Sequence, residues 1–251
     1  IQVPTKSKIR DMEEINQNFN LMVRALDATE VLQSDFVSNV SHEFKTPITA
    51  IEGYAMLLQD TPQMSTEQQE YVDKILLNTK RLSELIGNVL LLSKIENQQI
   101  PTTKKPYQLD EQIRKVLMLY EPQWTEKELE LDVELADVIY HGNEQMLFHV
   151  FSNLIGNAIK FNRPGGLLQL RLEEKEGQVL FSVADEGPGI SPEDQEHIFE
   201  KFYQGDSSHK QTGNGLGLSL VKRILNACGG EIAVENRAEG GAQFSVHLKT
   251  E

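Results

Sequence analysis

Apolar side chains recur at steps of three and four residues through the first hundred positions, which is the spacing of one face of an α-helix. Residues 9–98 are nearly free of glycine, and proline occurs there only at Pro47 and Pro62. The polar stretch around Pro62 breaks the pattern and predicts a turn, with Ser65 or Thr66 as the N-cap of a second helix. We therefore expect a helical hairpin. The repeating positions are Ile9, Met12, Ile15, Phe19, Met22 and Leu26, and later Val72, Ile75, Thr79, Leu82, Ile86 and Val89.

Two helices cannot surround an apolar core by themselves. A homodimeric four-helix bundle is the economical arrangement for such a pair. We assign the antiparallel hairpin to residues 31–100 and expect it to dimerise.

The pattern changes after residues 100–106 to shorter elements with alternating apolar and polar positions, so a second domain is expected over residues 101–251. The mixture of elements predicts an α/β sandwich of a sheet against helices. The predicted helices cover residues 110–120, 144–161 and 217–228. The predicted strands cover residues 128–135, 167–173, 178–184, 231–236 and 243–249.

Composition and charge limit the kinds of partner and covalent cross-link that are expected. The 251 residues include 38 acidic and 24 basic side chains, and the net charge of −14 repels nucleic acid and anionic lipid. The single cysteine, Cys228, excludes an intrachain disulfide and is expected to pack against a helix. No apolar run reaches the roughly 18–20 residues of a membrane-spanning helix. Because the chain begins at Ile1 without a methionine, we expect a portion of a longer protein.

A histidine near the middle of the first helical segment is a candidate nucleophile. On a helix of about 100° per residue, His42 lies almost opposite the apolar stripe and projects into solvent. Glu43 can accept the proton from one ring nitrogen, and Thr46, one turn on, can orient a water for the reverse hydrolytic reaction. Pro47 predicts a bend beside the histidine. A solvated surface histidine on a kinked helix is the alternative. The stripe consists of Val37, Val40, Phe44, Ile48, Ile51, Ala55 and Leu58.

The helix predicted over residues 144–161 places three polar side chains on one face. Asn153, Asn157 and Lys160 lie at i, i+4 and i+7. Carboxamide oxygens can hold Mg²⁺ directly or through its waters, and the lysine can meet a phosphate. An ordinary amphipathic helix gives the same pattern.

A carboxylate follows the apolar strand predicted over residues 178–184. Asp185 begins a glycine-rich turn and can accept a hydrogen bond from an exocyclic amine such as that of adenine. Gly187 and Gly189 would admit the ring close to the backbone. A simple turn remains the alternative.

The polar stretch 204–212 predicts a mobile lid over a ligand. Residues 213–217 then open a helix whose free N–H groups and positive dipole end suit a triphosphate. The spacing matches neither the Walker nor the Rossmann pattern. A plain loop-to-helix junction is the alternative.

Five segments, in order, resemble the motifs of bacterial two-component sensor histidine kinases. They are FVSNVSHEFKTPI at 36–48 (H-box), FSNLIGNAIKFN at 151–162 (N-box), DEGPGI at 185–190 (first G-box), IFEKFYQ at 198–204 (F-box) and GNGLGLSL at 213–220 (second G-box). The resemblance implies a histidine-phosphotransfer hairpin at 31–100 and a catalytic ATP-binding domain of the Bergerat class at 101–251. It also implies that residues 1–30 are similar to the end of a HAMP signal-relay module, which a transmembrane sensor normally precedes.

The resemblance also implies roles for residues. His42 would be the phosphoacceptor, Glu43 its acid/base partner and Thr46 the residue that assists a phosphatase reaction. Mg²⁺ would be held by Asn157 with Asn153, and ATP by a wider set. That set is Asn153, Asn157, Lys160, Phe161, Asp185, Gly187, Gly189, Ile190, Lys210, Gly213, Gly215, Leu216 and Gly217.

The chain departs from the family pattern at three positions. Gln204 stands where arginine is frequent, Phe161 where tyrosine is, and Asn143 where aspartate is. The change at Gln204 leaves stabilisation of the γ-phosphate to Lys210 or another lid residue, which bears on rate rather than on class.

We therefore expect the cytoplasmic portion of a bacterial membrane protein that acts as a homodimeric, ATP-dependent histidine autokinase. Its phosphoryl group would pass to the receiver domain of a response regulator, and no nucleic acid partner is expected. Two alternatives are a Bergerat-type ATPase clamp and a nucleotide-binding scaffold. Neither forms phosphohistidine, which is labile in acid and stable in base.

Overall fold

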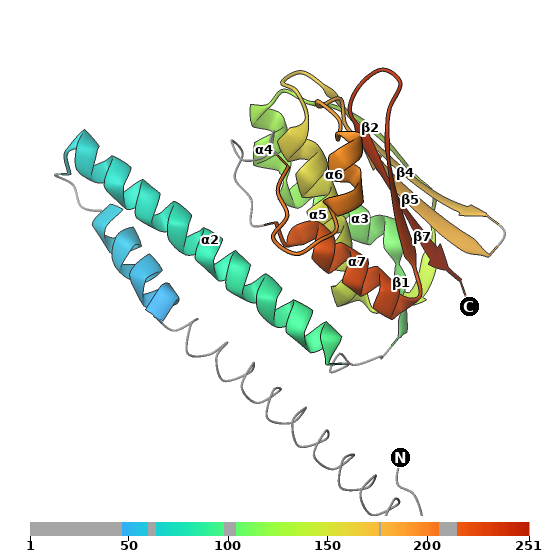
Figure 1. The fold of residues 1–251 in the computed structure, drawn as a ribbon. Helices are drawn as coiled ribbons and strands as arrows, with labels where there is room; N and C mark the ends of the chain where they lie inside the picture. The colour runs from blue at the N-terminus through green and yellow to red at the C-terminus, as the bar shows by residue number, and fades with distance from the viewer. Residues whose placement is uncertain (1–46, 60–63, 98–103, 176, 206–214, 251) are drawn as a thin grey trace, which may run out of the picture. The chain divides into compact units, whose positions relative to one another are not determined.

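The computed structural model describes residues 47–59, 64–97, 104–175, 177–205 and 215–250, and divides the chain into two compact units, 1–99 and 100–251. Figure 1 shows a pair of helices in the first unit and layers of helices and strands in the second. In the described part of the chain, no helix is both long enough and apolar enough to cross a membrane.

The first unit is a helical hairpin. Residues 47–59 form the described part of its first helix, and α2 (Thr66–Glu96) is its second. The start of α2 is fixed by a capping box, because Gln68 N donates to Ser65 Oγ at 3.2 Å and Ser65 N donates to Gln68 Oε1 at 2.8 Å. Gln59 Nε2 donates to Asp73 Oδ1 at 2.9 Å across the hairpin. The predicted hairpin and the N-cap at Ser65 are confirmed for the described residues.

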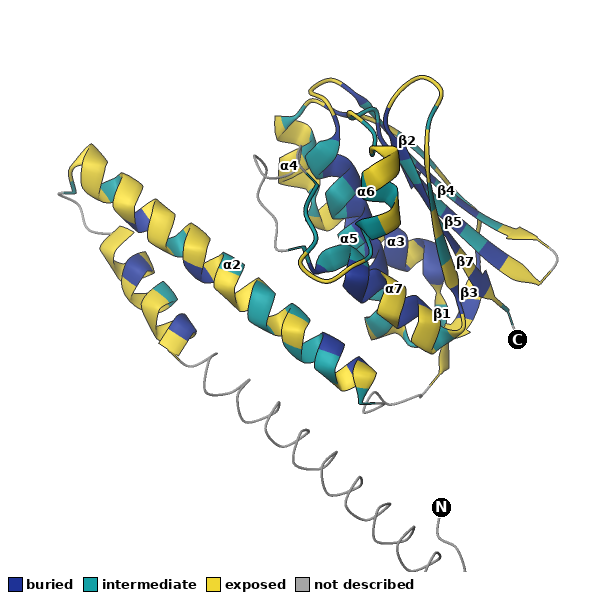
Figure 2. Ribbon diagram, in the orientation of Figure 1, coloured by how far each residue is buried: buried dark blue, intermediate teal, exposed yellow. Residues whose placement is uncertain are grey.

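The apolar faces of the hairpin are only partly buried (Figure 2). Ile48 and Ala55 are at most 4% exposed and Val72 is 3% exposed. Other positions of the two predicted stripes are 41–51% exposed. These exposed positions are Ile51, Leu58, Ile75, Leu82 and Val89. One chain therefore leaves a large apolar surface uncovered on its hairpin.

The second unit is built on a five-stranded sheet in the order β2-β4-β5-β7-β6. Strand β2 runs parallel to β4, and the other neighbours are antiparallel. The strands are β2 (Glu130–Leu135), β4 (Leu167–Lys175), β5 (Gln178–Ala184), β6 (Glu231–Asn236) and β7 (Ala242–Lys249). A separate pair joins β1 (Lys105–Gln108) to β3 (Ile139–Gly142).

Helices cover one face of this sheet (Figures 1 and 2). Alternate residues of β4, β5 and β7 are buried, and the rings of Phe151 on α5 and Phe181 on β5 meet edge to face with centroids 4.9 Å apart. The core thus lies between sheet and helices. The helices are α3 (Leu109–Leu119), α4 (Glu121–Glu126), α5 (Glu144–Phe161), α6 (Pro192–His197) and α7 (Gly217–Cys228).

The three predicted helices and five predicted strands of this unit are confirmed, with ends that differ by at most two residues. The pattern did not predict β1, β3, α4 or α6. Strands β1 and β3 have four residues each, which allows only two alternations, and helices α4 and α6 have six residues each, which is less than two helical turns, so neither kind shows a clear periodicity.

Candidate functional site

Five of the expected site residues lie outside the described residues: His42, Glu43, Thr46, Lys210 and Gly213. The bend expected next to Pro47 lies at the edge of the described helix, where its other side is not described. The remaining expected residues all lie in the second unit, on α5, on the turn after β5 and at the start of α7.

The polar face of α5 lies next to the first residue of α7. Asn143 Oδ1 accepts from Met146 N at 3.1 Å and so starts the helix. Asn153 Nδ2 donates to the backbone oxygen of His149 at 2.8 Å. Asn153 Oδ1 faces Gly217 so closely that a Cβ at that position would overlap it. The structure thus brings together one N-box asparagine and the second glycine motif, which are 64 positions apart in the chain.

Asn157 and Lys160 are half-buried on the same side of α5. The side chain of Asn157 makes no hydrogen bond to another described residue. The ammonium of Lys160 lies 4.5 Å from the centroid of the Phe161 ring, a cation–π contact. Burial lowers the pKa of Lys160, and the nearby charge of Lys127 lowers it further. An anion bound beside Lys160 would offset both effects.

Asp185 follows the last residue of β5 and is buried, with 4% of its surface exposed. Its Oδ1 accepts from Gly187 N at 2.8 Å and from Ala242 N at 3.3 Å. No other described residue donates a hydrogen bond to Oδ2. Burial raises the pKa of Asp185, while the two backbone N–H groups, Arg237 and Lys127 act in the opposite direction. The free oxygen can therefore accept a hydrogen bond from a ligand.

The turn after Asp185 packs on the end of α5. A Cβ at Gly187 would overlap the backbone oxygen of Phe161, so only glycine permits this approach. Gly189 adopts a left-handed φ of 73°. Ile190 is half-buried and is held through its backbone: its N donates to Asn236 Oδ1 at 2.9 Å, and Asn236 Nδ2 donates to its oxygen at 2.7 Å.

The base of the segment expected to form a lid is also fixed. Gly215 has a φ of 65°, and its oxygen accepts from Phe202 N at 2.8 Å. Phe202 itself has a φ of 63°, which is unusual for a residue other than glycine. Leu216 is 1% exposed, so its side chain belongs to the core of the unit. No described side chain caps the start of α7, so its first N–H groups can bind an anion.

Sequence reasoning missed two asparagines that support the turn. Asn162 is 4% exposed; its Oδ1 accepts from Glu186 N at 3.1 Å and its Nδ2 donates to Leu167 O at 3.0 Å. Asn236 holds Ile190 as described above. Asn162 stands inside the quoted N-box, where its position after the helix was a usable signal. Asn236 carries no such signal, because it is 46 positions away from Ile190.

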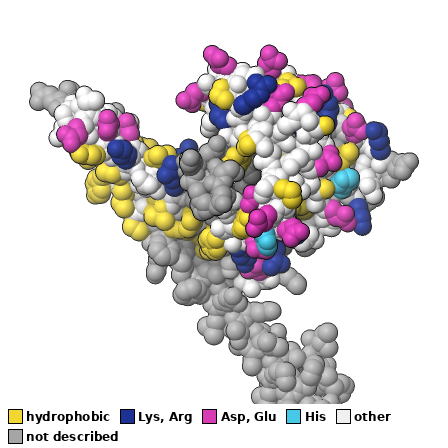
Figure 3. All heavy atoms as spheres, turned by 45° about the horizontal axis from the view of Figure 1, so that its top comes forward, with side chains coloured by type: hydrophobic (Ala, Val, Ile, Leu, Met, Phe, Trp, Pro, Cys, Tyr) yellow, Lys and Arg dark blue, Asp and Glu magenta, His cyan; other side chains and the backbone are white. Residues whose placement is uncertain are grey.

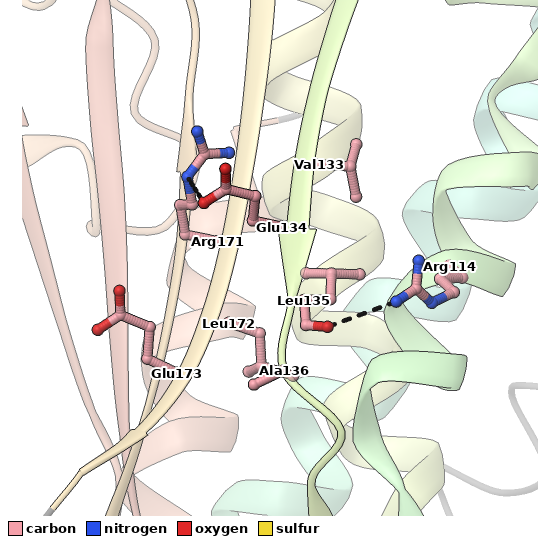
Figure 4. A pocket seen from close by; sticks show the side chains of 8 residues that line it. All are labelled: Arg114, Val133, Glu134, Leu135, Ala136, Arg171, Leu172 and Glu173. Atoms are coloured by element: carbon pink, nitrogen blue, oxygen red, sulfur yellow. Dashed lines mark hydrogen bonds and ion pairs between the residues drawn. The ribbon is translucent and has the colours of Figure 1, made fainter.

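A shallow hollow at the sheet edge lies apart from these residues. Figure 4 shows Arg171 Nε 3.2 Å from Glu134 Oε2, and Arg114 donating to the backbone oxygen of Leu135 at 3.4 Å. Carboxylates neutralise both guanidinium groups, and none of the expected site residues lines the hollow. Its lining is Arg114, Val133, Glu134, Leu135, Ala136, Arg171, Leu172 and Glu173.

Two family models match the chain. Residues 32–98 match the His Kinase A (phospho-acceptor) domain. Residues 142–251 match the histidine kinase-, DNA gyrase B-, and HSP90-like ATPase domain.

Comparison with a curated relative extends over nearly the whole chain. The chain is 34% identical to the heme sensor protein HssS of Staphylococcus saprophyticus over 235 residues, which are 94% of this chain and 50% of the relative. The chain spans about half the length of the curated relatives it matches.

Solved structures share the fold. The full-length ShkA structure in complex with AMPPNP has a TM-score of 0.72 and 31% identity, over 86% of this chain and 46% of that one. The nucleotide-free catalytic domain of histidine kinase ThkA has a TM-score of 0.53 and 30% identity, over 59% of this chain and 99% of that one. These likenesses confirm the expected fold class, a helical region followed by an α/β ATPase domain.

Proposed function

The chain belongs to the histidine kinases, and on that premise we propose that it moves the γ-phosphoryl group of MgATP to a ring nitrogen of His42. From there the group passes to an aspartate on the receiver domain of a response regulator. The proposal is carried by the observation that residues of separate motifs lie in one unit at the two ends of an expected ATP site. Asn153 lies against Gly217 at the phosphate end, and the buried Asp185 keeps one oxygen free at the adenine end.

The adenine end is formed by Asp185 and the turn that follows it. Its free Oδ2 accepts a hydrogen bond from the exocyclic amine of adenine, whereas guanine would present a carbonyl oxygen to the same carboxylate. Gly187 lets the turn lie against α5, and the clamped backbone of Ile190 keeps the turn in place. Selectivity for adenine follows from this single polar contact in a buried setting.

The phosphate end is formed by α5 and the start of α7. Lys160 meets a phosphate oxygen, and the uncapped N–H groups that begin at Gly217 point to another. Gly215 shapes the base of the lid, and Gly213 and Lys210 complete the phosphate contacts. Gln204 stands where the family pattern often has arginine, and Lys210 makes the contact with the γ-phosphate in place of that arginine.

The donor set fits Mg²⁺ bound together with ATP. Among the described residues no group of three acidic, histidine or cysteine side chains is arranged to hold a metal by itself. Asn157 and Asn153 instead offer neutral amide oxygens, to which phosphate oxygens and waters add. The ion would offset the negative charge that gathers on the transferring phosphoryl group.

The hairpin supplies the acceptor. Glu43 takes the proton from one nitrogen of His42, which leaves the other nitrogen to attack the γ-phosphorus in line with its leaving oxygen. The phosphoryl group then moves to the regulator's aspartate. In a separate phosphatase reaction, Thr46 orients the water that hydrolyses the phosphoaspartate to aspartate and inorganic phosphate.

A second copy of the chain covers the hairpin. Figure 3 shows hydrophobic side chains gathered along its helices. The uncovered positions recur every seven residues within each helix, as they do when two hairpins form a four-helix bundle: Ile51 and Leu58 on the first helix, and Ile75, Leu82 and Val89 on α2. In the whole protein, we propose, this chain is the cytoplasmic part of a membrane-anchored sensor, and residues 1–30 are the end of a HAMP-like relay.

One labelling experiment tests the assignment. The chain is incubated with γ-labelled MgATP beside the His42→Gln variant, and the label on protein is then treated with acid or with base. We expect label that is lost in acid and kept in base, and none on the variant. An ATPase clamp would release phosphate and leave both proteins unlabelled. A scaffold would also leave both proteins unlabelled, but it would bind ATP without releasing phosphate.

A further inference from the structure

Lys127 belongs to none of the five sequence motifs, yet its ammonium lies at the end of α5. Its Nζ donates to the backbone oxygens of Ile159 at 3.0 Å, Lys160 at 2.6 Å and Asn162 at 3.1 Å. The last carbonyls of a helix have no partner within it, and the helix dipole favours a cation there. An ammonium has three N–H donors. All three therefore serve this one helix end.

The turn that Lys127 holds is part of the proposed nucleotide site. It carries Lys160, which faces the phosphates, and Phe161, whose backbone oxygen lies directly against Gly187. The same turn therefore sets the spacing between the phosphate-binding ammonium and the turn that follows Asp185. A displacement of the helix end would alter both ends of the site.

The charges of these groups are also linked. Lys127 lowers the pKa of Lys160 in addition to the effect of burial. Burial lowers the pKa of Lys127 itself, while the charge of Asp185 acts in the opposite direction. Lys127 is thus close enough to influence the ammonium at one end of the site and the carboxylate at the other.

The backbone is shaped to present Lys127 at this place. Lys127 is the C-cap of α4, which ends in a Schellman motif: Glu128 N donates to Thr125 O and Leu129 N donates to Trp124 O, each at 3.0 Å. Glycine normally occupies the left-handed position of this motif, but Glu128 occupies it here with a φ of 53°.

The segment after α5 is joined to the same place. Gly165 N donates to the backbone oxygen of Lys127 at 2.9 Å, and Glu130 N donates to Gly166 O at 3.0 Å. Lys127 is therefore fixed through its backbone as well as its side chain, from both sides of the end of α5. A lysine that only covered surface would need neither attachment.

We propose that Lys127 is a positioning residue for nucleotide binding, which holds the last turn of α5 so that Lys160 and the turn after Asp185 engage one ATP molecule together. The inference rests on the proposed function and deepens it. Lys127 touches no reacting atom in this scheme. Its removal weakens ATP binding and leaves the transfer step itself almost unchanged.

The test compares Lys127→Met with the parent chain and with Lys115→Met, an exposed lysine on α3 that serves as the matched control. The dissociation constant for ADP is measured by calorimetry, and KM for ATP and kcat are measured for self-phosphorylation. We expect Lys127→Met to raise the dissociation constant and KM about tenfold and to change kcat less than twofold. Lys127→Arg, which keeps a cation with several donors, should return KM to within threefold of the parent value.

The outcomes separate this inference from the proposed function. A parent chain that does not bind ADP would overturn both. A parent that binds ADP, with an unchanged constant in Lys127→Met, would overturn only the role of Lys127, even if the variant unfolds at a lower temperature. If Lys127→Met does not fold, Lys127→Gln replaces it, and a constant within twofold of the parent value overturns the inference in the same way.

Discussion

The two units use the same kind of apolar periodicity and bury it to different extents. In the second unit, Phe151, Leu168 and Phe181 are completely buried between sheet and helices. In the hairpin, Ile75 and Leu82 belong to an equally regular stripe and remain 42% and 47% exposed. A sheet with helices on one face closes a core within one chain, whereas two helices do not. The catalytic unit is therefore complete in one copy, and the hairpin requires a second.

The largest effect is expected from a substitution in the closed core of the second unit. Phe151→Ala should lower the free energy of unfolding of the second unit by about 3–5 kcal/mol, because it removes a ring packed on Phe181 and leaves a cavity. Trp124, the only tryptophan of the chain, lies in this unit, so its fluorescence during denaturant unfolding reports this core. Dimerisation of the hairpin should not change. A loss below about 1 kcal/mol would show that the core is not closed as described.

The open face of the hairpin offers the next largest effect. Leu82→Glu should raise the dissociation constant of the dimer by at least about a hundredfold, because it places charges in an apolar interface. Sedimentation measures this constant. Ser83→Glu, which adds the same charge one position along the helix, is the control and should have little effect. A dimer that survives Leu82→Glu would mean that the exposed stripe is not the interface.

The third test concerns the hydrogen bond that Asp185 of the second unit is proposed to accept from adenine. Asp185→Asn should raise the dissociation constant for ADP about tenfold to a hundredfold, because a hydrogen bond to a charged group contributes about 1.5–3 kcal/mol. Asp137→Asn, at an exposed position, is the control. Both constants are measured by calorimetry.

The affinity for ADP should also depend on pH, and the pKa of Asp185 gives the direction of the change. Burial raises the pKa of Asp185, so the free site takes up a proton at a higher pH than an ordinary aspartate does. ADP affinity of the parent should be full near neutral pH and fall as the pH decreases through that raised pKa. The Asp185→Asn variant lacks this titration, and an equal slope in both proteins would count against the contact.

The smallest effect is expected at Glu128. Glu128→Gly should stabilise the second unit by about 1 kcal/mol, because glycine adopts the left-handed conformation without the clash that a side chain brings. The greater freedom of glycine in the unfolded chain reduces this gain. Trp124 fluorescence measures it, and KM for ATP should stay the same. Destabilisation would show that the Glu128 side chain contributes more than its backbone costs.

Elements longer than six residues in the second unit could be predicted from the sequence, since each shows a period of its own. Helices α5 and α7 and strand β5 were predicted with their observed ends. Strand β3 and helix α4 were not, because a strand of four residues and a helix of less than two turns do not reveal a period. The missed α4 matters most, since Lys127 is its C-cap.

The residues of the site also divide into those that the sequence could predict and those that it could not. Asn153, Asp185 and Gly217 could be selected because motifs of a known order contain them, although their roles remain predictions. Asn236 and Lys127 could not. Each acts through hydrogen bonds to backbone atoms far away in sequence, and no residue pattern encodes such a bond.

The sequence by itself determined the two-unit plan, the main helices and strands and the order of the chemical motifs, because side-chain periodicity and local backbone preference are properties of short segments. Only the tertiary structure decided that Asn153 faces Gly217, that Asp185 keeps one oxygen free, and that Lys127 closes the end of α5. These are contacts between distant segments, and packing of the whole unit brings their atoms within bonding distance.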